Sequence, residues 1–497
     1  MIRTGRQYID SIRDGREIYL NGERVKDVTR HPMFKPLVDI RARIYDMQHD
    51  PATQGIMTYE DGGERHAIAN KPPVSQQDWL NKRAAVDAVL NDIGGVVTRV
   101  GDETVGEMWS LMDGKDVLNA ADPRFAINIE RHINRALHAD PFHVSANTDP
   151  KGDRSKPPQE QDPDMLLHVV KETDAGLIVV GAKYETAAAY ANQAFAKPTI
   201  ANWGDAAYSD YAVGFIVDMG APNLKFICRT GFATRAPAED YPLSNRFDEV
   251  DALVIFDHVL IPWENVLFYR STEAATYIRA SLHRYSAFPF VQRTLKLADM
   301  MIGAGLLNVR QTGQENQQAV QEKLATLAVY REGINAHLTA AIVMAKPSPS
   351  GLMMPDPSLL YAGRVLACSQ LPAMMHIARE LCGGQICLTP DKASFEAAGP
   401  GPWLQKYYSI NERWVAEDRR KLMAFARDLL NSDYAGHRLT FQLFAQSPPF
   451  AHLAAVYRSF DWGQAVDFVQ SAAGLSERVL PKSAPVRGEQ RASAVAG

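Results

Sequence analysis

A short segment around Thr186 combines a β-strand pattern with an unusual density of small residues. It reads "HVVKETDAGLIVVGAKYETAAAYAN" from 168 to 192, with two β-branched runs separated at 174–176. This pattern is typical of two strands joined by a tight turn. The second strand continues into alanines around Thr186. Small residues allow a flat group to approach the backbone, and they are also typical of a strand edge that simply packs closely.

The number of cysteines and the absence of common nucleotide-binding motifs exclude several classes of protein. Four cysteines in 497 residues do not form a disulfide framework. Cys382 and Cys387 could form a metal-binding pair, but buried apolar thiols are the favoured interpretation, and we predict no metal. The chain has no HExxH, no P-loop and no GxGxxG after a strand. It therefore lacks a fingerprint for binding a nicotinamide dinucleotide.

Composition and charge place the chain among ordinary globular proteins. Hydrophobic residues make up 46% and charged residues 22%, and the net charge is -5. We expect no nucleic-acid partner, because no basic field is present. No apolar run reaches the roughly 18 residues of a spanning helix, so we expect no membrane association. The charged N-terminus lacks the apolar core of a signal peptide, which indicates the cytoplasm.

The hydrophobic periodicity divides the chain into three regions. Residues 1–138 are predicted to be mainly helical, with a clear helix at 77–90, and 145–162 is a long polar loop. Five short runs rich in β-branched residues follow without intervening helices, and they predict an antiparallel sheet or barrel over 139–270. These runs are 166–172, 176–183, 211–219, 224–230 and 251–262.

From about 275 the period becomes helical. Long helices are predicted at 293–311, 320–342, 358–381 and 403–430, and Pro372 should kink the third of them. Such a set is typical of an antiparallel bundle over 271–480. Residues 481–497 lack bulky apolar anchors and are predicted to form a flexible tail.

Motifs spread over nearly the whole chain resemble the oxygenase components of the 4-hydroxyphenylacetate 3-monooxygenase family. They include "RTGRQYIDSIRDGREIYLNGERV", "DPKGDR", "VVKETDAGLIVVGAK", "SNRFDEVDALVIFDHVLIPWENV", "CGGQICLTP" and "NSDYAGHR", in the family's order. The resemblance implies an α+β fold like that of acyl-CoA dehydrogenases. This fold has an N-terminal helical domain, a middle antiparallel β-barrel and a C-terminal four-helix bundle. A homotetramer is implied as well.

The resemblance also implies an activity. Family members take reduced FAD, or alternatively reduced FMN, from a separate NAD(P)H-flavin reductase. They activate O2 as a C4a-hydroperoxyflavin and hydroxylate a phenolic or heteroaromatic acid. A non-catalytic flavin-binding or structural homotetramer, and an acyl-CoA dehydrogenase-like oxidoreductase, are the alternatives. A related iron–sulfur dehydratase is excluded because no cysteine precedes Cys228.

Three segments match the family's flavin contacts. They are the polar loop, the turn at Thr186 and a turn at the end of the bundle. The implied cofactor-binding residues are Asp149, Pro150, Lys151, Asp153, Arg154, Thr186, Ser432, Tyr434, Gly436, His437 and Arg438. A solvated loop and a helix C-cap at Ala435-Gly436 are the purely structural alternatives. Asp251 is expected to hold a turn or a basic partner.

The match is weaker where the family binds its substrate. Arg99 keeps the family's arginine, but Glu103 stands where phenol hydroxylases have tyrosine, and Ser145 stands where they have histidine. The predicted catalytic residues are Arg99, His143, Ser145 and His283, and the predicted substrate-binding residues are Arg99, Glu103 and Ser145. An arginine here could bind a carboxylate or phenolate; it could equally form an ion pair with Asp102 or Glu103. His143 could act as a general base or be an ordinary loop residue.

Overall fold

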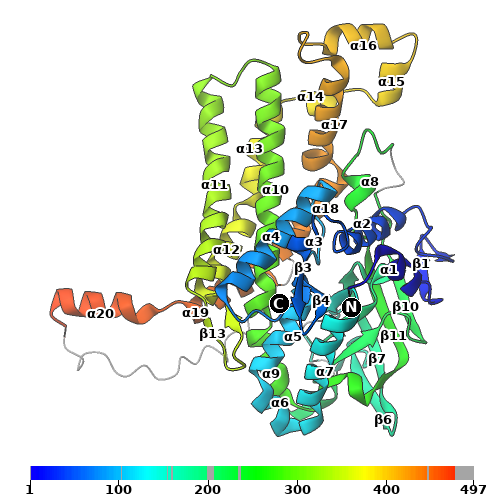
Figure 1. Cartoon of the computed structure of the whole chain (residues 1–497), viewed down its shortest axis with the longest axis vertical. Helices are drawn as coiled ribbons and strands as arrows, with labels where there is room; N and C mark the ends of the chain where they lie inside the picture. The colour runs from blue at the N-terminus through cyan, green and yellow to red at the C-terminus, as the bar shows by residue number, and fades with distance from the viewer. Residues whose placement is uncertain are drawn as a thin grey trace.

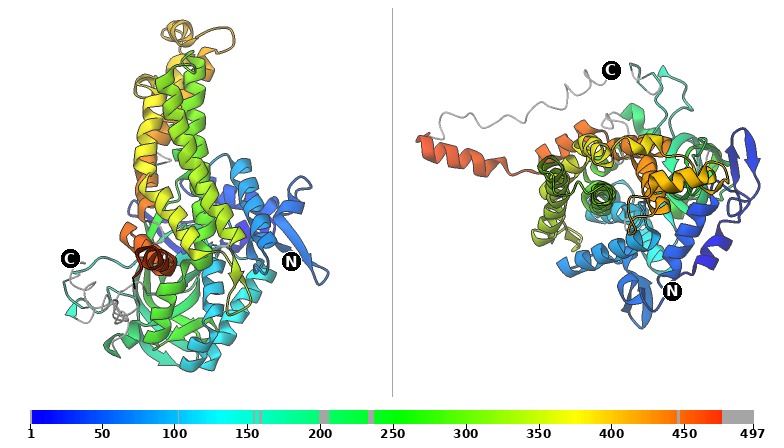
Figure 2. Two further views of the ribbon diagram at one scale, coloured as in Figure 1. Left: turned by 90° about the vertical axis from the view of Figure 1, so that its left-hand side faces the viewer. Right: turned by 90° about the horizontal axis from the view of Figure 1, so that it is seen from above.

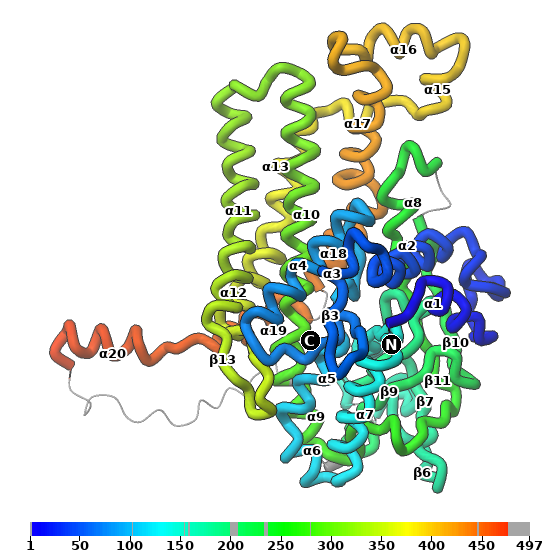
Figure 3. The backbone as a smooth tube through the Cα atoms, in the orientation of Figure 1, coloured from blue at the N-terminus to red at the C-terminus, as the bar shows by residue number. Residues whose placement is uncertain are grey.

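The structure is a computed structural model, and it describes residues 2–101, 103–153, 155–157, 160–198, 206–232, 237–444 and 447–475. A helical N-terminal region and two β-sheets form a broad base, from which a tall group of helices rises (Figure 1). Two further views show the same arrangement (Figure 2), and the backbone trace can be followed in Figure 3. The predicted tail at 481–497 lies outside the described residues.

The N-terminal region is mainly helical, as predicted. Its helices are α1 (Gly5–Ser11), α2 (Lys35–Asp46), α3 (Gln54–Met57), α4 (Gln76–Ile93), α5 (Glu103–Asp113), α6 (Lys115–Ala121) and α7 (Pro123–Ala139). A hairpin of β3 (Thr58–Asp61) and β4 (Glu64–Ala67) lies between them. The predicted helix at 77–90 is α4, which starts with a capping box at Ser75 and ends at the left-handed Gly94.

The larger sheet has six strands in the order β2-β1-β10-β11-β7-β6. Their bounds are β1 (Glu17–Leu20), β2 (Glu23–Val25), β6 (His168–Thr173), β7 (Gly176–Thr186), β10 (Leu224–Cys228) and β11 (Asp251–Pro262). Every neighbouring pair is antiparallel except β1 and β10, which are parallel. The N-terminal hairpin β1–β2 therefore extends a sheet whose other strands come from the middle of the chain.

The second sheet has four strands in the order β12-β9-β8-β5. They are β5 (His143–Ala146), β8 (Gln193–Ala196), β9 (Val213–Asp218) and β12 (Val266–Tyr269). The fold class is confirmed. The described strands form two separate sheets, so the middle β-barrel stays a prediction. The β5–β8 pair is also parallel. Phe215 of β9 packs against Phe256 of β11, so side chains rather than a hydrogen-bonded ladder join the sheets.

The C-terminal bundle is built around the long helix α10 (His283–Gln311). It packs against α11 (Gln318–Val343), α12 (Pro357–Ser369), α13 (Leu371–Cys382) and α17 (Ala416–Asn431). The predicted kink at Pro372 is a full break, since α12 ends at Ser369 and Pro372 lies in the first turn of α13. None of the described helices has the length and apolar character needed to span a membrane.

The remaining α-helices of the described residues are shorter than α10 and α11. They are α8 (Ser244–Phe247), α9 (Thr272–Ser281), α14 (Gln385–Leu388), α15 (Lys392–Glu396), α16 (Gly401–Tyr408), α18 (Asp433–Phe444), α19 (Pro449–Ser459) and α20 (Trp462–Ala473). The predicted helix at 403–430 is therefore interrupted between α16 and α17. Helix α20 projects away from the body (Figure 1).

Candidate functional site

Thr186 ends β7 and lies opposite Asp251, the first residue of β11. The Thr186 hydroxyl donates to Asp251 Oδ1 at 2.5 Å. The other carboxylate oxygen of Asp251 lies 2.8 Å from Arg229 Nε and 2.8 Å from His437 Nε2. Burial raises the pKa of Asp251, but the hydrogen bond and charge of His437 and the charge of Arg229 outweigh it and hold that pKa well below its usual range. The expected basic partner of Asp251 is confirmed.

The alanines after Thr186 lie in the protein interior. Residues 187–191 are fully or almost fully buried. The carbonyl oxygens of Ala189 and Ala191 accept from Arg16, at 3.0 and 2.8 Å. These small residues therefore pack closely, and the approach of a flat group to this turn stays a prediction. Thr186 itself is only partly buried.

The bundle contributes His437 from the first half of α18. Ser432 precedes this helix, and its Oγ accepts from the Ala435 amide at 3.2 Å. Ala435 and Gly436 therefore lie inside α18, and the alternative of a helix C-cap there is wrong. The His437 ring also lies 5.7 Å, between centroids, from the ring of Phe232. Two of the three predicted cofactor segments thus meet at Asp251.

Arg438, the next residue, points into the protein. Its guanidinium donates to the Phe247 carbonyl at 3.2 Å and lies 3.5 Å from Glu249. It also covers the ring of Tyr434, which is itself buried. Of the two basic residues in the predicted turn, His437 is therefore the one beside Thr186.

The predicted flavin loop lies along the same strand. The Tyr184 amide donates to the Thr148 carbonyl at 2.7 Å, and Asp149 forms an ion pair with Lys183 of β7. Further along, Asp153 accepts from Ser155, and its own amide donates to Gln161 Oε1 at 2.8 Å. Pro150 is half-buried, Lys151 is exposed, and Arg154 lies outside the described residues.

Arg99 belongs to a buried charge network that adjoins Thr186 through Glu185. Arg99 Nη2 lies 2.7 Å from Glu185 Oε1 and Nη1 lies 3.8 Å from Glu103 Oε2. Glu103 also pairs with Arg293 of α10. Burial raises the pKa of Glu185 to about 8. The structure thus gives Arg99 a nearer partner than Glu103, while Asp102 lies outside the described residues.

Ser145 belongs to a second buried group that the sequence analysis missed in part. Its hydroxyl donates to Glu107 Oε2 at 2.5 Å and accepts from Lys197 Nζ at 2.5 Å. Lys197 Nζ also lies 2.5 Å from Glu107 Oε2, which closes a triangle. Burial lowers the pKa of Lys197 to about 8, although Glu107 opposes the shift. The available signal was weak: Glu103 and Glu107 share one face of α5, and Lys197 follows a buried strand.

The two predicted catalytic histidines lie in different surroundings. His143 is buried, neither ring nitrogen has a hydrogen-bond partner in the described part of the chain, and burial lowers its pKa to about 3. His143 and Arg99 line a cavity of about 60 Å³. That volume suits a few water molecules. His283 begins α10, where its Nδ1 lies 3.1 Å from Ser286 Oγ.

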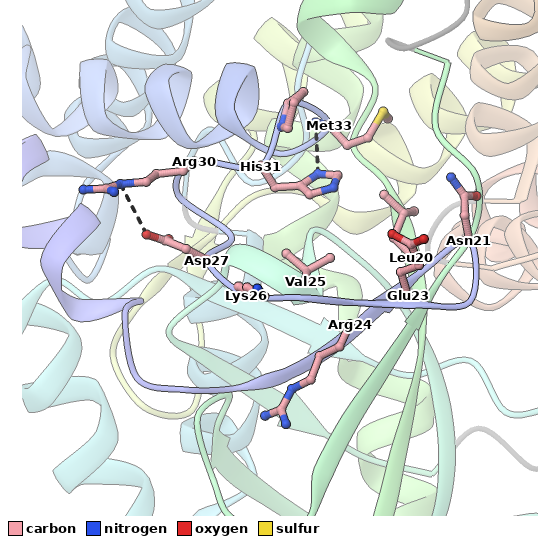
Figure 4. A pocket seen from close by; sticks show the side chains of 11 residues that line it. Leu20, Asn21, Glu23, Arg24, Val25, Lys26, Asp27, Arg30, His31 and Met33 are labelled. Carbon is pink, nitrogen blue, oxygen red and sulfur yellow. Dashed lines mark hydrogen bonds and ion pairs between the residues drawn. The ribbon is translucent and has the colours of Figure 1, made fainter.

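A larger hollow of about 640 Å³ lies at the edge of the six-stranded sheet. Side chains of β1, β2 and the following loop line it (Figure 4). None of its lining residues was a predicted site residue. It adjoins the Arg229 segment, because Asn21 Oδ1 accepts from Thr230 Oγ1 at 2.8 Å.

The fold and the sequence define the class to which the chain belongs. Helical region, sheets and bundle together form the acyl-CoA dehydrogenase-like fold. Within it, the chain belongs to the 4-hydroxyphenylacetate 3-hydroxylase family. The N-terminal sequence model of that family matches residues 4–268, and the C-terminal model matches residues 272–474.

Individual relatives agree over most of their length. The chain is 28% identical to the 4-hydroxyphenylacetate 3-monooxygenase oxygenase component of Thermus thermophilus, covering 93% of this chain and 95% of the relative. It is 31% identical to the 4-nitrophenol 2-monooxygenase oxygenase component of a Rhodococcus species, covering 88% and 85%. A solved 4-hydroxyphenylacetate 3-monooxygenase oxygenase component complexed with FAD superposes with a TM-score of 0.88 at 27% identity, covering 96% and 99%.

Proposed function

We propose that this chain is the oxygenase component of a two-component aromatic monooxygenase that uses reduced FAD and O2. The observation that carries the proposal is the meeting of Thr186 and His437 at Asp251, beside a loop anchored on β7. These segments are the ones that match the flavin contacts of the family. The likeness to oxygenase components over nearly the full chain supports the same activity.

The donors and acceptors at Thr186 suit a reduced flavin. Since the Thr186 proton is committed to Asp251, the hydroxyl oxygen is left to accept from a ring N–H. Arg229 adds positive charge beside it. When bound, the flavin supplies the electrons that activate O2. The protein would hold the ring proton at Thr186 Oγ and keep that hydroxyl oriented through Asp251.

The buried charges favour an anionic aromatic substrate. Arg99, Lys197 and Arg293 face Glu103, Glu107 and Glu185. Burial raises the pKa of Glu185, which favours its neutral form and weakens the negative charge that faces these cations. Buried charge of one sign favours a ligand of the other. We therefore assign a carboxylate or an ionised hydroxyl to the substrate, with Arg99 and Ser145 among the groups that meet it.

A separate reductase follows from the lack of a nicotinamide fingerprint. Purified chain with NADH, FAD and a panel of phenols and aromatic acids should form no hydroxylated product. Addition of a generic flavin reductase, or of chemically reduced FAD, should start product formation. Product from NADH without reductase would contradict the assignment of the reductase as a separate partner. Failure to bind reduced FAD at all would favour the structural alternative, which needs no flavin.

Replacement of Thr186 by alanine should divert oxygen into hydrogen peroxide. Loss of the acceptor leaves the flavin ring proton unheld, so a larger share of the consumed O2 is released as peroxide and a smaller share as product. The fold should persist, since one hydroxyl is worth about 1 kcal/mol. Thr276→Ala, which removes an exposed hydroxyl bonded to its own helix, is the control. Equal product yields per O2 in both variants would remove Thr186 from the flavin site.

We also propose that the chain forms a homotetramer. Helix α20 has no buried residue, and it exposes large apolar side chains along its length: Trp462, Val466, Phe468 and Val469. Exposed large apolar side chains on one helix are typical of an interface with another subunit.

A further inference from the structure

We infer that the chain binds a Zn²⁺ ion between the β3–β4 hairpin and the end of α7. The ligands are Glu64 and His66 of β4 and His138 of α7. One ligand atom from each residue lies within 4.8 Å of the ligand atoms of the other two. These elements carry none of the residues of the Thr186 cluster, so the inference is independent of the proposed function.

The orientation of His66 is the strongest indication. Its Nδ1 lies 3.1 Å from the Leu137 carbonyl oxygen. Since a carbonyl oxygen only accepts, Nδ1 carries the proton, and Nε2 keeps its lone pair. Histidines that bind metals are commonly fixed in this way, with the second ring nitrogen donating to a carbonyl. The orienting residue, Leu137, directly precedes the second histidine, so one turn of α7 positions both imidazoles.

Strand β4 places Glu64 on the same side as His66. Glu64 and His66 are two residues apart in β4 and therefore point to the same face. Arg65 between them pairs with Glu60 of β3. Across the gap, His138 Nδ1 lies 3.4 Å from Glu64 Oε2, and the two imidazole centroids are 5.1 Å apart.

The distances fit one ion after a small adjustment. Ligand atoms on a common zinc ion at about 2.1 Å are at most about 4.2 Å apart. Glu64 and His138 are exposed and can move, whereas His66 is buried and fixed. Two imidazoles and one carboxylate suit Zn²⁺ rather than Mg²⁺ or Ca²⁺, which prefer oxygen ligands. Water would complete the coordination on the exposed side.

Zinc binding to untagged, chelator-stripped protein tests the inference. Titration against a chromophoric chelator should give one Zn²⁺ per chain, and Co²⁺ at the same site should give a visible absorption band. Glu64→Gln and His138→Ala should each weaken Zn²⁺ binding by at least about tenfold. Both residues are exposed, so these variants should fold. His258→Ala is the matched control, because His258 is an exposed histidine beside a carboxylate, Asp257, at 3.1 Å.

Two results would overturn the inference. The first is the absence of stoichiometric Zn²⁺ binding. The second is wild-type affinity in Glu64→Gln and His138→Ala, which would locate any bound zinc elsewhere, for example at the exposed Cys387. If the three residues form only an ion pair and a packed histidine, Zn²⁺ will also leave the melting temperature of the wild type unchanged.

Discussion

Replacement of Lys197 by methionine is expected to lower the free energy of unfolding by about 3–5 kcal/mol. Lys197 is 1% exposed, and its Nζ lies 2.5 Å from both Glu107 Oε2 and Ser145 Oγ. Methionine fills a similar volume but leaves Glu107 without its cation in the protein interior. Chemical denaturation of the variant and the wild type measures the loss.

Lys225→Met is the matched control for this experiment. Lys225 pairs with Asp257 at 2.6 Å, but its side chain is 32% exposed, so its loss should cost much less stability than the loss of Lys197. The double variant Lys197→Met/Glu107→Gln should recover much of the stability, because no unpaired buried charge is left. Equal losses for Lys197→Met and Lys225→Met would show that the buried triangle does not stabilise the fold.

The elements of the fold could be predicted because burial leaves a local periodicity. The run rich in β-branched residues at 251–262 predicts β11, and the helical repeat at 320–342 predicts α11. Pairing depends instead on contacts between distant segments. The parallel register of Glu17 with Lys225 joins strands about 200 residues apart, and nothing in either segment indicates the partner.

One error could have been avoided from the sequence. The helical repeat at 403–430 continues across Asn411, but the Asn411 side chain accepts from the amides of Arg413 and Trp414 and makes a turn. Asparagine is a frequent turn residue because its side chain competes for nearby backbone amides. The prediction of one helix followed the helical repeat and did not take the turn at Asn411 into account.

The candidate site, like the fold, could be predicted from the sequence only in part. The family resemblance identified Thr186 and His437 separately, and the structure brings both to Asp251. The partners of the buried charges were not visible in the sequence. Glu185 is 86 residues from Arg99, and Lys197 is 90 residues from Glu107. Their contacts exist only once β7, β8 and α5 have packed together.

The partner of Arg99 matters for the last prediction. From the sequence, Arg99 could bind an anionic substrate or form an ion pair with Asp102 or Glu103, and the structure adds Glu185 at 2.7 Å as a partner that the sequence did not indicate. Burial raises the pKa of Glu185, however, which weakens the negative charge that this partner offers the guanidinium. The Nε atom of Arg99 is also buried and has no hydrogen-bond partner among the described residues. The guanidinium therefore retains charge and a donor for an anionic substrate.

Arg99→Ala should raise the apparent KM for substrate by roughly tenfold to a hundredfold. A charge-assisted contact of this kind is worth roughly 1.5–3 kcal/mol. Arg99→Lys should recover part of the loss, since it keeps the charge without the planar fork. Glu185→Gln, which keeps the shape of the partner, should change KM little, and binding of reduced FAD should be equal in all variants. If Arg99 only stabilises the fold through Glu185, Arg99→Ala and Glu185→Gln will both lower the melting temperature while KM stays constant. Steady-state kinetics beside melting curves for the four proteins separates these outcomes.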